Sequence, residues 1–176
     1  MEFENVVWQR SVREGYVVLL RAEAELLLPT EGERIRDFYE KTASACLSWA
    51  TDVWGERLRD DFCRLSNRER ATFRIQRYRF YMRIPWQEGP YVTILCESRR
   101  NTSGGTEDLH RICHTWNTDE QTVLPKKQIL RLFSAELAKK ELPFAPDGIY
   151  KEKEKLVIFK NRGEKNDFLE AKLPIN

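Results

Sequence analysis

Two histidines and a cysteine lie within five residues of each other, at His110, Cys113 and His114. Zinc is usually held by three or four such ligands, and a bound zinc ion can activate water for hydrolysis. On a strand, however, the two histidines would point to one face and Cys113 to the other. On a helix the glutamate of the H-E-x-x-H motif would be missing. We therefore expect ordinary strand histidines and no cofactor, with a metal-dependent hydrolase using these three residues as an alternative.

A run of arginines and aromatic residues, RIQRYRFYMR, occupies residues 74–83. Strand alternation would place four of its side chains on one face: Arg77, Arg79, Tyr81 and Arg83. An adjacent strand could bring Arg99 and Arg100 close to them. Arginines interleaved with aromatic rings can hold phosphates and stack bases, so binding of single-stranded nucleic acid is a second alternative. The other interpretation is a solvated sheet face, because 30 basic and 28 acidic residues nearly cancel and give no argument for nucleic acid.

The remaining candidates for catalysis are weaker. The loop Ser103–Thr106 contains two glycines and could cradle an anion, but a hairpin loop explains it and both phosphate-binding glycine motifs are missing. The adjacent carboxylates Asp60 and Asp61 would point in different directions from a helix. There is no G-x-S-x-G nucleophile elbow. The sequence has no specific catalytic signature, so an enzyme is the less favoured interpretation.

The element expected to position everything else is one long amphipathic helix over Glu31–Leu65. Spacings of three and four residues predict its buried face, which would comprise Ile35, Phe38, Tyr39, Thr42, Ala45, Cys46, Trp49 and Val53. Gly55 could bend or divide the helix, because glycine costs about 1 kcal/mol in a helix interior. So broad an aromatic face needs a sheet to cover it.

Strand-like runs flank this helix. A hairpin is predicted from Asn5–Val12 and Tyr16–Leu28, where alternate residues of the second strand are apolar. A meander is predicted from Phe73–Ile84, Tyr91–Ser98 and Asp108–Trp116. The alternation changes parity in the first of these strands, which predicts a β-bulge near Gln76–Arg77.

A second, shorter helix is expected to begin near Pro125 and to bury an apolar stripe of Ile129, Leu130, Phe133 and Leu137. The runs Leu156–Lys160 and Phe168–Leu173 predict a C-terminal hairpin. The fold class is therefore α+β: an antiparallel sheet, made of the hairpin and the meander, packed against one long helix.

With 176 residues, the chain is expected to form a single domain over 1–176, with a possible subdomain division near residue 105. The four cysteines form no C-x-x-C pair and are expected to be buried, although a Cys96–Cys113 disulfide is possible if their strands are neighbours. No secretory signal or membrane-spanning run is apparent. We expect a cytoplasmic protein as the sequence stands, or an extracytoplasmic one if a leader has been removed.

Several short segments follow one another in an order that matches a known family. They are Leu28-Pro29, Ile35–Tyr39, Tyr91–Ser98 with the following glycine loop, Thr115–Phe133 and Phe144–Ile149. The family counterparts are a strand ending in Tyr-Pro, I-N-x-F-Y, a strand before T-G-G-A-H, D-x-x-T-G-x-x-L-x-L-x-D-L-F, and F-x-L-T-x-D-G-L. Through them the chain resembles the extracytoplasmic domain of RsiV-like anti-sigma factors, which also accompanies the catalytic domain of PdaC-like peptidoglycan deacetylases.

The resemblance implies an α+β fold and a non-catalytic binding or sensing module, with a protein or a cell-wall-related ligand. Two departures limit it. The family histidine after the two glycines has no counterpart, since Thr106-Glu107 follow Gly105. The late Y-x-I-A-P-Y-A-x-G motif is replaced by the polar stretch Lys160–Asp167. No site residue of the family is therefore assigned to this chain.

Overall fold

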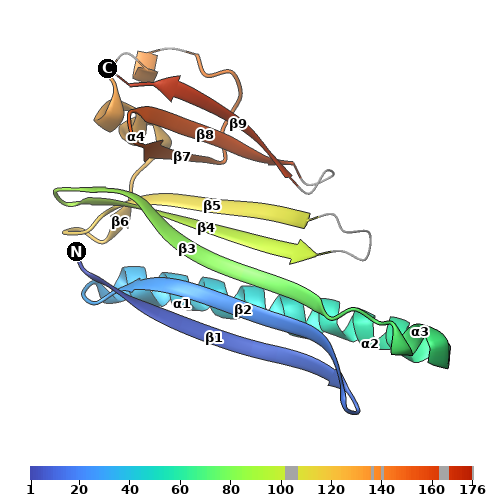
Figure 1. Ribbon diagram of the computed structural model, residues 1–176. Coiled ribbons are helices and arrows are strands. Elements are labelled where there is room, and N and C mark those ends of the chain that lie inside the picture. Colours follow the sequence, from blue (N-terminus) through green and yellow to red (C-terminus); the bar gives the residue numbers. More distant parts are fainter. Residues whose placement is uncertain (102–106, 136, 140, 163–166, 176) are drawn as a thin grey trace.

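The structure, a computed structural model, describes residues 1–101, 107–135, 137–139, 141–162 and 167–175. The glycine loop and the possible boundary near residue 105 lie outside these residues. The predicted α+β fold is confirmed (Figure 1). Its elements are β1 (Phe3–Glu14), β2 (Val17–Pro29), α1 (Glu33–Ser48), the π-helix η1 (Trp49–Trp54), α2 (Gly55–Arg64), α3 (Asn67–Ala71), β3 (Gln76–Glu88), β4 (Tyr91–Asn101), β5 (Glu107–Asn117), β6 (Thr122–Val123), α4 (Lys126–Phe133), the 3-10 turn η2 (Leu137–Lys139), β7 (Gly148–Glu152), β8 (Lys155–Arg162) and β9 (Asp167–Pro174).

A six-stranded sheet in the order β1-β2-β3-β4-β5-β6 contains both the predicted hairpin and the predicted meander. The two are joined by a parallel pairing of Leu20–Glu25 with Gln76–Tyr81, so the sheet is not wholly antiparallel. The reason is the long helix, which returns the chain to the same end of the sheet before β3 begins. The C-terminal hairpin β8–β9 gains a third strand, β7, and forms a separate sheet.

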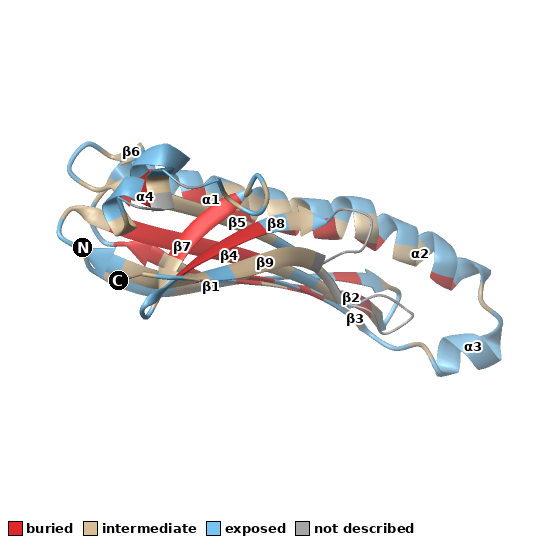
Figure 2. Ribbon diagram, turned by 90° about the horizontal axis from the view of Figure 1, so that it is seen from above, coloured by how far each residue is buried: buried red, intermediate tan, exposed pale blue. Residues whose placement is uncertain are grey.

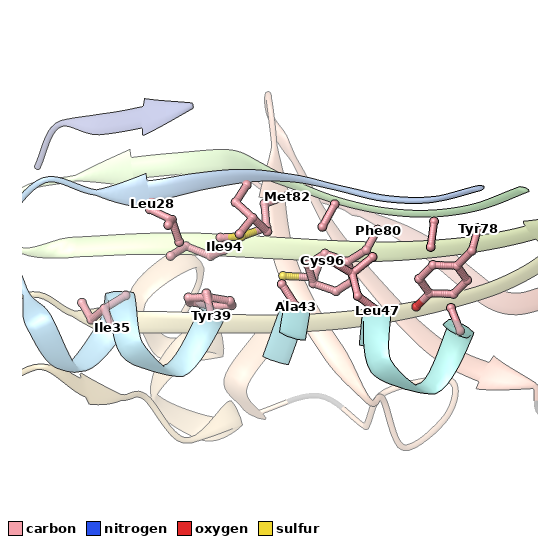
Figure 3. Packing of buried hydrophobic residues seen from close by; sticks show 14 of the residues in the cluster. Leu28, Ile35, Tyr39, Ala43, Leu47, Tyr78, Phe80, Met82, Ile94 and Cys96 are labelled. Atoms are coloured by element: carbon pink, nitrogen blue, oxygen red, sulfur yellow. The ribbon is translucent and has the colours of Figure 1, made fainter. Parts of the chain in front are cut away.

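The long helix packs on the sheet, but the face predicted for it is only partly right: Ile35 and Tyr39 are buried as predicted, whereas Val53 is exposed. The buried side chains of α1 are Ile35, Tyr39, Ala43 and Leu47 (Figure 3), whereas Phe38 and Trp49 are 37% and 41% exposed. The sheet beneath is already filled by large side chains such as Phe80 and Ile94. Ala43 therefore faces the sheet between the larger Tyr39 and Leu47, and the rings of Phe38 and Trp49 lie at the flank.

The helix is continuous through Gly55, and its α-helical pattern is interrupted just before that residue by η1. A Cβ atom on Gly55 would lie only 2.6 Å from Val12 Cγ2. Glycine is therefore needed there because the helix approaches β1 closely, and not because the helix breaks.

The predicted bulge near Gln76–Arg77 is wrong, because β3 begins at Gln76. The change of register against β4 falls instead between Arg83 and Trp86. Pro85 lies within this gap and has no N–H to donate to a ladder, which explains why the pairing is irregular there.

The three-stranded sheet packs on the face of the main sheet opposite α1. Leu95 and Cys113 contact a cluster of Tyr150, Val157 and Phe159, and Figure 2 shows β7 and β8 lying over β4 and β5. The other face of the small sheet is covered by α4 through Ile129 and Leu130, as the helical stripe predicted. The fold is thus layered, and the part of the main sheet around β4 and β5 is covered on both sides.

The four cysteines are free. Cys96 pairs across the ladder with Ile112, and Leu95 pairs with Cys113, so the Cys96 and Cys113 side chains point to opposite faces of the sheet. A disulfide between them is therefore excluded by the geometry. Within the described part of the chain, none of the helices has the length and apolar character needed to cross a membrane.

Candidate functional site

The three potential metal ligands do not converge. His114 and His110 face the α1 side of the sheet, where His114 contacts Phe38 and His110 lines a hollow beside Trp49. Cys113 faces the small sheet and donates its thiol hydrogen to Ile149 O at 3.3 Å. Burial raises the pKa of Cys113 to about 12, so the thiol stays protonated. Among the residues that the structure describes, no three His, Cys, Asp or Glu side chains are grouped to hold a metal ion.

His114 belongs instead to a buried aromatic network under the helix. Trp116 Nε1 donates to Tyr39 Oη at 2.9 Å, and Tyr39 Oη lies 3.4 Å from His114 Nδ1. Burial lowers the pKa of His114 and raises that of Tyr39 well above its ordinary value. Both groups are therefore neutral near pH 7, and their role is to orient the rings.

Phe38 covers this network at the surface. Its ring centroid lies 5.2 Å from that of His114 and 5.6 Å from that of Trp116, in edge-to-face arrangements. Such pairs typically contribute about 0.5–1.5 kcal/mol each beyond their buried area. The exposed ring of Phe38 is thus anchored on one side by ring contacts with the network.

Two adjoining hollows run along the flank of α1 that faces β5 and share Ala45; we call them the α1–β5 groove. The first has a volume of about 780 Å³ and is lined by Arg34, Asp37, Phe38, Lys41, Thr42, Ala45, Trp116, Thr122 and Val123. The second has a volume of about 390 Å³ and is lined by Ala45, Cys46, Trp49, Tyr78, Ser98, Arg100 and His110.

The second hollow is built by the π-helix. The guanidinium of Arg100 lies 5.5 Å from the ring centroid of Trp49 and 5.4 Å from that of Trp54, which begin and end η1. The wider turn of a π-helix changes the direction of the following side chains, and such turns are frequent at functional sites. Here it brings both tryptophans to one arginine, so this end of the groove combines a cation with large aromatic surfaces.

The basic and aromatic residues of β3 lie on the opposite face of the sheet and do not form one continuous surface. Arg77 and Arg79 are exposed, and the Arg99 guanidinium lies 5.3 Å from the Tyr81 ring centroid. Arg83 is drawn toward the small sheet, 5.7 Å from the ring centroid of Tyr150. Glu23 and Glu25 line the same hollow as Arg79 and Arg99. Acidic groups thus interrupt the basic face.

A buried ion-pair network, which the sequence analysis did not find, joins the two sheets. Arg111 donates to Glu97 and, at 2.6 Å, to Glu170, and its guanidinium lies 3.5 Å from the Phe168 ring centroid. Burial opposes ionisation of Glu97, but hydrogen bonds from Tyr81 and Arg111 outweigh it and lower the pKa of Glu97. Arg111 is paired with two carboxylates of the protein, and the side chains of Arg111 and Glu97 are almost buried. This arrangement points to a structural role.

The groove could not be predicted from the helical spacing, which indicated that Phe38 and Trp49 are buried in the core. A signal was present in the predicted stripe, which contained the neighbouring pairs Phe38–Tyr39 and Ala45–Cys46. Neighbours on a helix are about 100° apart, so a stripe that includes both members of such pairs is wider than one sheet contact covers. The surplus apolar residues therefore had to lie at a flank.

Comparison with known proteins supports the fold. No family model and no curated protein matches the sequence. Among solved structures, a DUF3298 family protein from Pseudomonas aeruginosa PAO1 is similar, with a TM-score of 0.54 and 13% identity over 98% of this chain and 89% of that one. A DUF3298 family member from Bacteroides fragilis has a TM-score of 0.51 and 8% identity over 98% and 90% of the two chains. At these identities the similarity concerns the fold alone.

Proposed function

We propose that this chain is a non-catalytic binding module that receives a polypeptide segment in the α1–β5 groove. The observation that carries the proposal is the row of exposed apolar side chains along one groove: Phe38, Trp49 and Val123 are 37%, 41% and 41% exposed. Contiguous apolar surface of this kind marks interaction sites, and aromatic residues and arginine are the types enriched in protein interfaces.

The charges at the rim favour a polypeptide over a polyanion. Arg34 and Lys41 lie beside Asp37 in the first hollow, and Lys41 Nζ forms an ion pair with Asp37 at 2.7 Å. A rim of mixed sign suits a ligand with both acidic and basic side chains, whereas a nucleic acid would need a uniformly basic surface. On the resemblance to anti-sigma-factor domains, we infer that the module serves to sense its ligand.

The length of the groove sets the size of the ligand. Its ends, at Arg34 and Trp49, are 15 residues apart on a helix that rises 1.5 Å per residue, or about 22 Å. An extended chain advances about 3.3 Å per residue, so the groove accommodates about seven residues. This span is long enough for sequence-specific recognition.

A random library of linear dodecapeptides provides the test. Enriched peptides are measured by fluorescence polarisation against the wild type, Phe38→Ala and Trp49→Ala. We expect each groove variant to weaken binding about thirtyfold, as for an anchor worth about 2 kcal/mol. Tyr16→Ala is the matched control, because Tyr16 is an exposed aromatic residue of the β1–β2 turn, outside the groove.

Two results would contradict the proposal. Peptides that bind Phe38→Ala and Trp49→Ala as tightly as wild type would place recognition elsewhere on the surface. Binding of soluble peptidoglycan glycan strands in the groove, with no enrichment of peptides, would replace the polypeptide ligand by a cell-wall polysaccharide.

A further inference from the structure

The strand β1 forms an unusually long free edge of the main sheet. Its 12 residues pair only with β2 in the described part of the structure, and Figure 1 shows β1 as the outermost strand. The central segment Asn5–Gln9 contains no charge, proline or glycine, and Val7 is 49% exposed. Natural proteins usually protect such an edge with charges, prolines or bulges. This unprotected segment is therefore a place for another strand to pair.

The hydrogen bond at the start of β1 shows which backbone groups are available. Thr30 N donates to Glu2 O at 3.0 Å, so the backbone groups of Glu2 point toward β2. Backbone groups alternate between the two sides of an antiparallel strand, and the β1–β2 register is regular until Val12. The odd-numbered residues of β1 thus present their N–H and C=O groups to the open edge: Phe3, Asn5, Val7, Gln9 and Ser11. Phe3 lies opposite Pro29, which has no N–H to donate. This agrees with the pattern, because the backbone groups of Phe3 point away from β2.

We propose that two copies of this chain pair through antiparallel β1 strands, with the two-fold axis at Val7. Outward backbone groups meet only in registers that pair odd-numbered residues with odd-numbered ones. When Val7 faces Val7 of the second copy, Asn5 faces Gln9 and Phe3 faces Ser11. The two six-stranded sheets then become one continuous sheet, and the exposed Val7 side chain is covered.

The charged residues within β1 favour this register. With the axis at Val7, Glu4 faces Arg10 of the second copy, and symmetry repeats this pair. Moving the axis to Trp8 places Glu4 opposite Val12 and loses both ion pairs. Moving it to Val6 places Glu4 opposite Trp8 and leaves Arg10 facing only Glu2, which precedes the strand. Both charged side chains lie on the α1 face of the sheet, because Glu4 pairs with Arg36 and Arg10 donates to Ser48 Oγ at 2.8 Å. The Glu4 side chain remains 47% exposed, which leaves it accessible to a second arginine.

Sedimentation velocity over a concentration series tests the pairing. We expect a concentration-dependent dimer for the wild type and at least about tenfold weaker association for Val7→Pro, which removes the central outward N–H but no hydrogen bond to β2. Val7→Thr is the matched control, because it keeps the N–H and a β-branched side chain, and should dimerise as the wild type does. A wild type that stays monomeric at all concentrations, or a Val7→Pro dimer as tight as wild type, would overturn the proposal.

A charge exchange tests the register independently of the proline. Glu4→Arg alone and Arg10→Glu alone each create two like-charge contacts, which should weaken self-association about tenfold. An equimolar mixture of the two variants restores both opposite-charge contacts and should form a heterodimer. If the mixture associates no better than either variant alone while both retain the wild-type circular dichroism spectrum, the register is wrong and the proposal falls. Phe38→Ala should leave the dimer unchanged, which separates this surface from the α1–β5 groove.

Discussion

Removal of the Arg111 guanidinium should strongly destabilise the contact between the two sheets. The side chains of Arg111 and Glu97 are only 10% and 6% exposed, so Arg111→Met leaves an ionised carboxylate with little access to water. Loss of one partner of a buried pair typically costs about 3–5 kcal/mol. Arg83 Nε remains 3.9 Å from Glu97 and compensates in part, so we expect a loss at the lower end, about 3 kcal/mol. Urea unfolding followed by tryptophan fluorescence measures this difference in the free energy of unfolding.

The pH dependence provides an internal check of the same reasoning. The pKa of Glu97 is lowered in the folded state from its ordinary value of 4.5. Its stabilising contribution is therefore complete above about pH 4.5 and is lost as the pH falls through the folded-state pKa. The difference between wild type and Arg111→Met should accordingly shrink in acid.

Arg77→Met is the matched control, because Arg77 is an exposed arginine of the main sheet and its loss should change the free energy of unfolding by less than about 0.5 kcal/mol. Equal effects of the two substitutions, or an Arg111→Met defect that grows as the pH falls, would refute the assignment of Arg111 and Glu97 as a buried stabilising pair.

Two further outcomes follow from the packing. Gly55→Ala should destabilise the protein by about 1–3 kcal/mol, because its Cβ would overlap Val12 Cγ2. In the same unfolding assay, Gly55→Ala should cost much less in a Val12→Ala background, where the overlapping methyl group is absent. An unaltered stability of Gly55→Ala in the wild-type background would show that the helix is free to shift. Thiol labelling followed by mass spectrometry should modify the exposed Cys63 first and the buried Cys96 only on unfolding, since burial raises the pKa of the Cys96 thiol well above its ordinary value. Equally fast labelling of Cys63 and Cys96 would contradict this.

Much of the fold could be predicted because the relevant signals are local. Alternate residues of β2 from Leu20 to Leu28 are apolar, and the structure buries them all. The start of α4 after Pro125 also followed from one residue, because proline lacks the N–H that a first helical position leaves unpaired. In both cases the preference resides in the segment itself and does not depend on its neighbours.

Which face of α1 is buried could not be predicted from the sequence of the helix alone. Phe38 and Tyr39 are both large aromatic residues and adjacent in the sequence, yet Tyr39 is buried and Phe38 lies at the surface. Burial of Tyr39 requires a hydrogen-bond partner for Tyr39 Oη, and Trp116 supplies one from 77 residues away. A buried hydroxyl needs such a partner, and the sequence of the helix does not reveal it.

The sequence by itself determined the long helix, the start of α4, the strands of the hairpin and the meander, the apolar alternation of β2 and the residue types available for binding. Only the tertiary structure decided that β2 and β3 pair in parallel, that Arg111 and Glu97 meet between the two sheets, and that Phe38 and Trp49 line one groove. The physical reason is that secondary structure reflects interactions over a few residues, whereas burial and site geometry depend on contacts between segments far apart in the chain.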